Sequence, residues 1–195
     1  SAASDVYKRQ QTTVDLTKTN YTVLPKNVSE NGVLKGCMFV GANASGKSNI
    51  ILSVKLLLDL LFSERSINSG MFKCMFGTGY SYSLVYDFLI DTKKVKYAIE
   101  VDTRKVGITE KLYVEDQLLL DRIGVSAKSY IAEKAGNFYD ESDVGKDTLF
   151  LRTLYFNTKF ASNKILVKWM DYLKNSVYIN TVSYTHLRAH ETRSN

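Results

Sequence analysis

The sequence predicts an α/β fold in which a strand–loop–helix unit carries an antiparallel β meander and appended helices. A glycine-containing loop at residues 41–48 joins a short apolar run to a long one. Much of 82–122 alternates between apolar and polar side chains, with the period of two that is typical of strands with one buried face. Residues 148–160 and 163–175 have helical spacing instead. With 195 residues, 45% of them hydrophobic, the chain is long enough for one domain with a core.

The strand–loop–helix unit begins at 35–40, which reads KGCMFV and is followed at once by glycine. A short apolar run that ends in this way predicts a buried strand of a parallel sheet. From residue 47 to about residue 64 the chain contains no Gly or Pro and is apolar on most sides. We therefore expect a helix that lies between a sheet and other helices.

The meander is predicted from four short segments, which are 82–90, 95–102, 108–115 and 118–122. Polar turns such as DTKK separate them, and apolar side chains stand at every other position, so one face of the sheet should be dry and the other wet. The polar stretch 124–146 is interpreted as a mobile connection with one weak helix. Two helices and a closing strand, SVYIN at 176–180, complete the expected fold.

The two ends of the chain are expected to be foreign to the protein. The stretches DVYKRQ (residues 5–10) and VSYTHL (182–187) can be written as translations of opposite strands of one DNA segment, a relationship that resembles translated sequencing-library adapters. We therefore assign residues 1–10 and 182–195 to adapter sequence and residues 11–180 to a partial domain of a longer protein. Both histidines lie in the last segment, which leaves no histidine for a catalytic or metal site.

Composition argues against several classes of protein. Outside the two end segments the net charge falls from +6 to about +4, which is a weak signal for nucleic acid binding. Cys37 and Cys74 lack the spacing of a zinc site, and reduced thiols favour a cytoplasmic protein. The most apolar stretch, 50–62, is shorter than the roughly 20 residues that cross a bilayer, so no membrane partner is expected.

The loop at 41–48 reads GANASGKS and matches the phosphate-loop pattern G-x-x-x-x-G-K-[ST] between a predicted strand and a predicted helix. Its glycines allow the backbone to approach phosphates closely, and peptide N–H groups at the helix start can converge on phosphate oxygens. Lys47 would bind the β and γ phosphates, and Ser48 would bind Mg²⁺. A turn that merely connects two elements needs no lysine there, so the pattern predicts nucleoside triphosphate binding. The predicted binding residues are Gly41, Ala42, Asn43, Ala44, Ser45, Gly46, Lys47, Ser48 and Asn49.

Other enzymes with this loop fit the sequence less well. The guanine-reading pattern N-K-x-D of GTPases has leucine at its last position in residues 163–166. Asp121 and Gly124 match D-x-x-G, but they stand at the end of a β segment, where a turn is the simpler interpretation. A small-molecule kinase would usually carry an arginine-containing lid, whereas an antiparallel meander follows the loop helix here. A GTPase and a kinase remain as alternatives to an ATPase.

Several segments together resemble a known family. GANASGKSN with the long apolar helix after it, YSLVYDFLIDTKKVKYAIEVDT, EKLYV and TLFL are similar to AAA-family ATP-binding proteins of bacterial abortive infection and phage defence. Their nucleotide-binding head is similar to those of ABC transporters, RecF and SMC proteins. The resemblance implies an ABC-ATPase-like head that uses ATP and Mg²⁺, with Lys47 as the catalytic, phosphate-binding lysine and Ser48 as the metal ligand. It also implies a homodimer through the head and a nuclease or toxin effector as partner.

The resemblance also marks what residues 11–180 lack. The acidic Walker B pair, the signature and the switch residue are expected beyond this segment, so the chain should bind ATP–Mg²⁺ weakly and hardly hydrolyse it. The FLID stretch at 88–91 imitates a Walker B strand, but Thr92 follows where Glu is expected, which favours a hairpin end. Asn157 is a candidate for the residue that contacts the Mg²⁺ from the segment after the meander, and Tyr21 is a candidate for stacking on adenine. The alternative function is a non-catalytic module that uses ATP for dimerisation or scaffolding, and direct DNA binding is motivated by the family alone.

Overall fold

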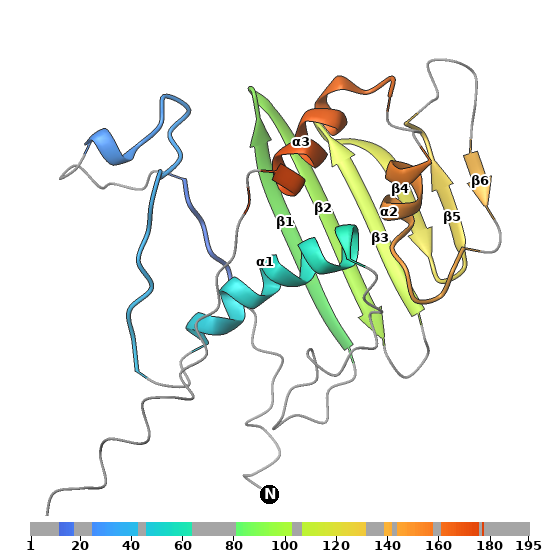
Figure 1. Cartoon of the computed structure of the whole chain (residues 1–195), viewed down its shortest axis with the longest axis horizontal. Coiled ribbons are helices and arrows are strands. Elements are labelled where there is room, and N and C mark those ends of the chain that lie inside the picture. Colours follow the sequence, from blue (N-terminus) through green and yellow to red (C-terminus); the bar gives the residue numbers. More distant parts are fainter. Residues whose placement is uncertain are drawn as a thin grey trace, which may run out of the picture.

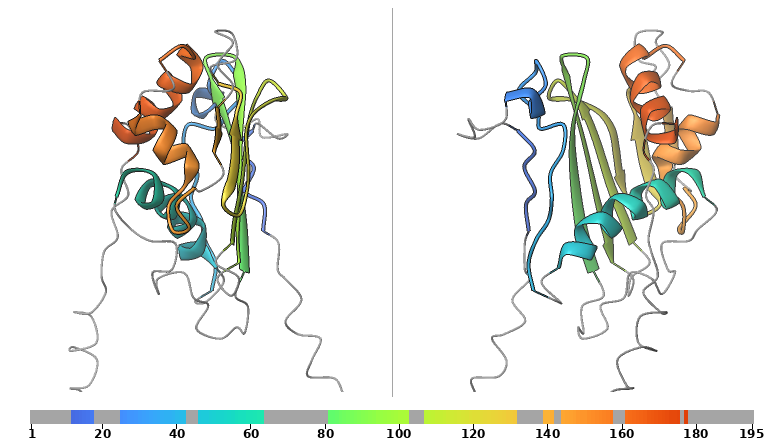
Figure 2. Two further views of the ribbon diagram at one scale, coloured as in Figure 1. Left: turned by 90° about the vertical axis from the view of Figure 1, so that its right-hand side faces the viewer. Right: turned by 60° about the vertical axis from the view of Figure 1, so that its left-hand side comes forward.

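The computed structural model describes residues 12–17, 25–42, 46–63, 81–102, 107–131, 139–141, 144–157, 161–175 and 177. These residues form one antiparallel sheet, and three α-helices cover the same face of it (Figures 1 and 2). Residues 1–10 and 182–195, assigned to adapter sequence, lie outside the described residues, as does the expected strand 176–180 except for Val177. Those expectations stay predictions.

Each of the six strands pairs antiparallel with the next, in the order β1-β2-β3-β4-β5-β6. Their bounds are β1 Ser81–Ile90, β2 Lys93–Asp102, β3 Gly107–Val114, β4 Gln117–Ile123, β5 Ser126–Ser129 and β6 Tyr139–Glu141. Asp91 in the β1–β2 turn has a φ of 57°, and Glu115 and Asp116 in the β3–β4 turn have φ values of 52° and 64°. Left-handed residues of this kind suit tight hairpin turns. The predicted meander is confirmed over its four segments.

The interpretation of 124–146 as a mobile connection with a weak helix is wrong for the described part of this stretch. β5 pairs with β4, where Ala127 lies opposite Arg122, and β6 pairs with β5. Strands of four and three residues are too short to give a clear alternating pattern, and most of their side chains are polar. β5 and β6 therefore cannot be recognised from composition alone.

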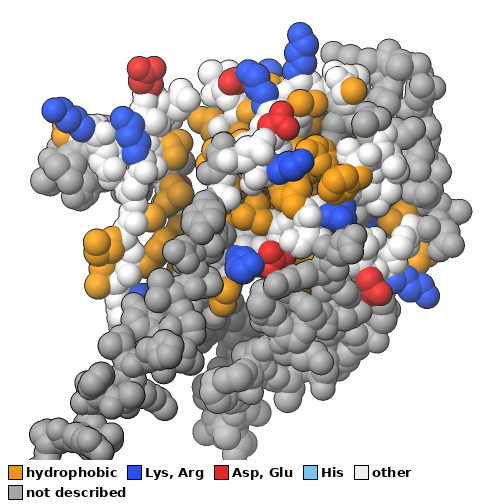
Figure 3. Space-filling model, viewed as in Figure 1, with side chains coloured by type: hydrophobic (Ala, Val, Ile, Leu, Met, Phe, Trp, Pro, Cys, Tyr) orange, Lys and Arg blue, Asp and Glu red, His pale blue; other side chains and the backbone are white. Residues whose placement is uncertain are grey.

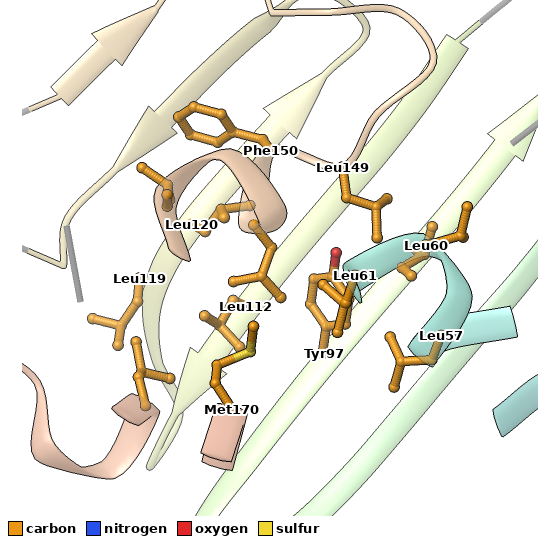
Figure 4. Packing of buried hydrophobic residues seen from close by; sticks show 14 of the residues in the cluster. Leu57, Leu60, Leu61, Tyr97, Leu112, Leu119, Leu120, Leu149, Phe150 and Met170 are labelled. Carbon is orange, nitrogen blue, oxygen red and sulfur yellow. The ribbon is translucent and has the colours of Figure 1, made fainter. Parts of the chain in front are cut away.

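The helices bury the dry face of the sheet (Figure 4). Their bounds are α1 Lys47–Phe62, α2 Phe150–Phe156 and α3 Lys164–Asn175, and a short 3₁₀ helix, η1, is Pro25–Asn27. Trp169 of α3 is fully buried, with its ring 5.5 Å from that of Phe88 and 6.0 Å from that of Tyr97 between centroids. Since Phe88 belongs to β1 and Tyr97 to β2, α3 packs on this half of the sheet. The helix predicted at 163–175 is confirmed.

α1 begins at the predicted residue, but it is not buried on most sides. Its buried residues all lie in its C-terminal half, and they are Leu56, Leu57, Asp59, Leu60 and Leu61. Ile51, near the N-terminus, is 40% exposed. The hydroxyl of Tyr86 on β1 donates a hydrogen bond of 2.7 Å to the carbonyl of Ser53, which ties the middle of the helix to the sheet. The first turns of α1 therefore lie at the surface.

A buried ion pair joins the sheet to the start of α2. Arg122 Nη1 lies 2.8 Å from Glu110 Oε1, and both side chains are fully buried. Glu110 also accepts hydrogen bonds from the Tyr97 hydroxyl (2.8 Å) and from the backbone N–H groups of Phe150 (2.7 Å) and Leu151 (3.2 Å). The first turn of a helix leaves such N–H groups without intrahelical partners, and a carboxylate is favourable there. Glu110 thus fixes α2 on the sheet.

The prediction of a buried parallel strand at 35–40 is wrong in this structure. Residues 36–42 form no strand, and Met38 and Val40 are 85% and 84% exposed. The segment runs beside the β1 edge of the sheet (Figures 1 and 2). A strand requires a neighbouring backbone to complete its hydrogen-bond ladder, and within the described ranges none pairs with 36–42. The described sheet is therefore entirely antiparallel, although the combination of sheet and helices agrees with an α/β fold.

Candidate functional site

The predicted phosphate loop lies between this exposed segment and the first turn of α1. The structure describes Gly41 and Ala42 at its start and residues 46–49 at its end, whereas residues 43–45 lie outside the described part of the chain. The side chain of Lys47 in α1 brings the two ends of the loop together.

Gly46 is the residue at which the loop becomes a helix. Its φ of 90° and ψ of 1° place it in the left-handed region, where side chains are disfavoured. The Gly46 carbonyl accepts hydrogen bonds from the N–H groups of Asn49 at 3.0 Å and Ile50 at 3.3 Å, so the helix begins directly after it. The expectation that glycine is needed for an unusual backbone conformation is confirmed at this position.

Lys47 folds back over the loop that precedes it. Its Nζ donates hydrogen bonds to the carbonyl oxygens of Gly41, at 2.8 Å, and Ala42, at 2.6 Å. Because these residues are five and six positions earlier in the chain, the lysine closes the loop into a ring. Its positive charge therefore lies where the start of the loop meets the start of the helix.

The electrostatics at this end of α1 favour an anion. The first turn of the helix contains no acidic residue, and no side chain forms a capping hydrogen bond at Gly46. The N-terminus of a helix carries a partial positive charge and directs N–H groups outward, which makes it suited to phosphate. Ser48 and Asn49 follow Lys47 and are exposed. An ammonium group, a helix N-terminus and an exposed hydroxyl group fit a nucleoside triphosphate with its Mg²⁺.

Within the described ranges, no group of three or more His, Cys, Asp or Glu side chains could hold a metal ion by itself. A hard cation such as Mg²⁺ commonly takes one or two protein ligands and completes its shell with water and phosphate oxygens. The exposed hydroxyl of Ser48 suits that role. A metal at this loop would thus depend on the nucleotide for most of its ligands.

Other residues considered from the sequence lie elsewhere. Asp91 occupies the β1–β2 turn with its Oδ2 2.6 Å from Lys168 Nζ of α3, which confirms the interpretation of 88–91 as a hairpin end. Gly124, with a φ of 65°, lies in the turn after β4, so the D-x-x-G match is a turn as expected. The suggestion that Asn157 watches the Mg²⁺ is wrong: Asn157 ends α2, which meets α1 at the end remote from Lys47. Tyr21 lies outside the described residues.

Comparison with known families decides the class of the domain. A model of the family described as "AAA domain, putative AbiEii toxin, Type IV TA system" matches residues 38–161. The chain belongs to this AAA-domain family. The matched range includes the phosphate loop, α1, the whole described sheet and α2, whereas α3 follows it. No curated protein and no solved structure matches the chain.

Membership in the AAA-domain family agrees with the resemblance expected from the sequence. It makes the chain a P-loop domain of the nucleotide-binding ATPase type, which is the class that the GANASGKS motif predicts. None of the helices in the described ranges is both long and apolar enough to span a membrane.

Proposed function

We propose that this AAA-domain protein binds ATP with Mg²⁺ through residues 41–49 and that the intact protein hydrolyses ATP in bacterial abortive infection or phage defence. The observation that carries the proposal is the position of Lys47 Nζ, which is bonded to the Gly41 and Ala42 carbonyls at the start of α1. The family match supports ATP as the nucleotide.

The carbonyl contacts of Lys47 can be exchanged for stronger ones. An ammonium group binds a charged phosphate oxygen more strongly than a neutral carbonyl, because both partners of the hydrogen bond are then charged. Lys47 has only to turn its end group from the start of the loop toward a triphosphate at the helix N-terminus. Mg²⁺, when bound, would neutralise charge on the β and γ phosphates. The role of Ser48 is to orient that ion.

We expect weak binding and very slow hydrolysis by the chain as it stands. A water molecule that attacks the γ phosphate has to be oriented by a nearby side chain. The acidic residues that imitate such groups in the sequence, Asp91 and Asp121, belong to the β1–β2 turn and to β4. Residues that activate water and complete the site are proposed to come from the rest of the intact protein and from a second copy of the head.

Binding of a fluorescent ATP analogue, with and without Mg²⁺, tests the proposal. Lys47→Ala should weaken binding at least about 10-fold, because the charge-assisted contact to phosphate is lost. Lys168→Ala is the matched control, since it removes the same charge from exposed Lys168 of α3, whose partner is Asp91. Equal affinity of wild type and Lys47→Ala would contradict the proposal.

Release of ADP separates the proposed ATPase from its alternatives. An intact protein that releases ADP, and loses this activity in Lys47→Ala, acts as an ATPase. Dimerisation on ATP addition without ADP release would instead support a non-catalytic module held together by nucleotide. If GTP displaces the fluorescent ATP analogue as well as ATP does, the result would support the GTPase alternative.

Binding of DNA by this part of the head is less well supported. On the outer face of the sheet Lys96 lies opposite Asp87, and Asp121 lies between Lys111 and Lys128 on the neighbouring strands. Figure 3 shows Lys and Arg side chains dispersed among Asp and Glu on the helical side as well. A nucleic acid would need a continuous positive surface, and its binding would weaken steeply as salt is added.

A further inference from the structure

α1 is held at the end opposite the phosphate loop by a side chain from α2. Arg152 Nη1 donates a hydrogen bond of 2.6 Å to the backbone carbonyl of Leu61. α1 ends at Phe62, so this carbonyl belongs to the last turn, where helix carbonyls have no intrahelical partner. Arg152 thus satisfies one of the carbonyls that every helix leaves unpaired at its C-terminus, where a positive charge is also favourable.

The guanidinium of Arg152 is itself held in place. It lies over the ring of Phe156, 4.6 Å from the ring centroid, one turn later in α2. Next to it, the rings of Phe62 and Tyr155 meet edge to face with 5.9 Å between centroids. These contacts form a joint between the last turn of α1 and α2.

The joint connects α1 to the part of the sheet that contains the buried ion pair. α2 starts at Phe150, whose N–H group donates to the buried Glu110 carboxylate. Arg152 follows two residues later. A displacement of the end of α1 would therefore shift its buried leucines in the core, and it would also have to break the Arg152 bond or disturb the buried ion pair of Glu110 and Arg122.

The phosphate loop lies at the other end of the same helix. Between the two ends, the Tyr86 hydroxyl holds the Ser53 carbonyl, and the first turns of α1 are only partly buried. α1 can therefore pivot about Ser53 if the Arg152 bond is lost and the packing of Leu57, Leu60 and Leu61 in the core shifts with it. Ser53 lies six residues after Lys47, or about 9 Å along the helix axis, so a tilt of about 6° would move the start of the helix by about 1 Å.

We propose that Arg152 is a positioning residue for the phosphate loop, which acts by fixing the direction of α1. This inference rests on the proposed ATP-binding function. Displacements of about 1 Å are enough to weaken the alignment of a binding site with its ligand. Arg152 bonds to Leu61, which lies 14 residues after Lys47 in the same helix, so Arg152 itself does not touch a nucleotide at the loop.

Three variants and two readouts test this role. Binding of the fluorescent ATP analogue to Arg152→Ala should be about 10-fold weaker than to wild type, and Arg152→Lys should recover part of the loss, because lysine can still donate to the Leu61 carbonyl. Leu119→Ala is the control for a general loss of stability, since Leu119 is a core residue of β4 that lies apart from α1 in Figure 4. Its affinity for the analogue should stay within about 2-fold of wild type at a temperature where all variants are folded.

The second readout does not need nucleotide. Hydrogen exchange at the amides of Asn49 and Ile50, which bond to Gly46, should be faster in Arg152→Ala and unchanged in Leu119→Ala. Wild-type affinity and exchange rates in Arg152→Ala would overturn the inference, and so would equal losses in Leu119→Ala. If wild type itself fails to bind the analogue, the proposed function fails, whereas the exchange rates still decide whether Arg152 positions α1.

Discussion

Arg122 and Glu110 form an ion pair that is completely removed from solvent, with 2.8 Å between Nη1 and Oε1. The guanidinium of Arg122 has further hydrogen-bond partners, because it also donates to the carbonyls of Gly124, Gly145 and Thr148. Buried charges are costly unless they are paired and hydrogen-bonded in this way. The pair thus joins β3 and β4 to the segment that leads into α2.

Replacement of Glu110 by Gln should strongly destabilise the protein. The substitution leaves the buried charge of Arg122 without a counterion, and breaking one partner of a buried pair typically costs about 3–5 kcal/mol. Urea unfolding measures this loss. Glu115→Gln is the control, because Glu115 belongs to an exposed pair with Lys93 at 3.6 Å, and exposed pairs contribute about 1 kcal/mol or less. A similar small cost for both variants would show that the buried pair does not hold α2.

Gly46→Ala should destabilise the protein through its backbone alone. A Cβ atom at Gly46 would meet no heavy atom within 4 Å, but its φ of +90° is unfavourable for alanine by about 1–2 kcal/mol. We also expect weaker ATP binding, because relief of this strain would change the path of the loop. Gly107→Ala is the matched control: its Cβ also meets nothing within 4 Å, and its φ lies outside the left-handed region. Calorimetry measures the melting temperatures of both variants, and we expect that of Gly46→Ala to be lower. Equal melting temperatures would show that Gly46 has another backbone conformation in solution.

The protein should lose stability in alkaline solution as its tyrosines ionise. Burial raises the pKa of Tyr82 from 10.0 to about 12. Burial also raises the pKa of Tyr97 well above its ordinary value, and the neighbouring Glu110 carboxylate adds to this effect. The folded protein therefore holds these protons more tightly than the unfolded chain does.

The sign of the effect follows from this difference. The stabilisation is fully present below pH 10, where both states are protonated, and it is lost as the pH rises from about 10 through the raised pKa values. Each tyrosine that stays protonated only in the folded state lowers the unfolding free energy by about 1.4 kcal/mol per pH unit. Urea unfolding between pH 9 and 12 measures the slope, which Tyr82→Phe should reduce. An unfolding free energy independent of pH over this range would contradict the burial of these hydroxyl groups.

Local patterns in the sequence were sufficient for the elements with strong periodicity. α1 starts at Lys47 as predicted, and α3 starts at Lys164, where the side chain of Asn163 accepts a hydrogen bond of 3.1 Å from the N–H of Leu166. The same alternation that predicts the dry face places Glu110 between the buried Ile108 and Leu112. A charged residue at such a position is a sequence signal for a buried ion pair, although its partner Arg122 becomes evident only in three dimensions.

What could not be predicted depends on contacts between distant segments. The apolar run at 35–40 does not say whether another backbone will pair with it, and the four residues of β5 are too few to show alternation. For the phosphate loop, the spacing of the motif predicts which lysine binds phosphate. Two contacts become evident only in the fold. Lys47 reaches back to two loop carbonyls, and Arg152 binds the far end of α1, the helix that carries Lys47.

A crystal structure of the chain with a non-hydrolysable ATP analogue and Mg²⁺ tests the central claim most directly. We predict triphosphate density at the N-terminus of α1, with Lys47 Nζ about 2.7–2.9 Å from phosphate oxygens and released from the carbonyls of Gly41 and Ala42. Crystals grown with saturating analogue that show no triphosphate at this helix end, and Lys47 still bonded to both carbonyls, would contradict it.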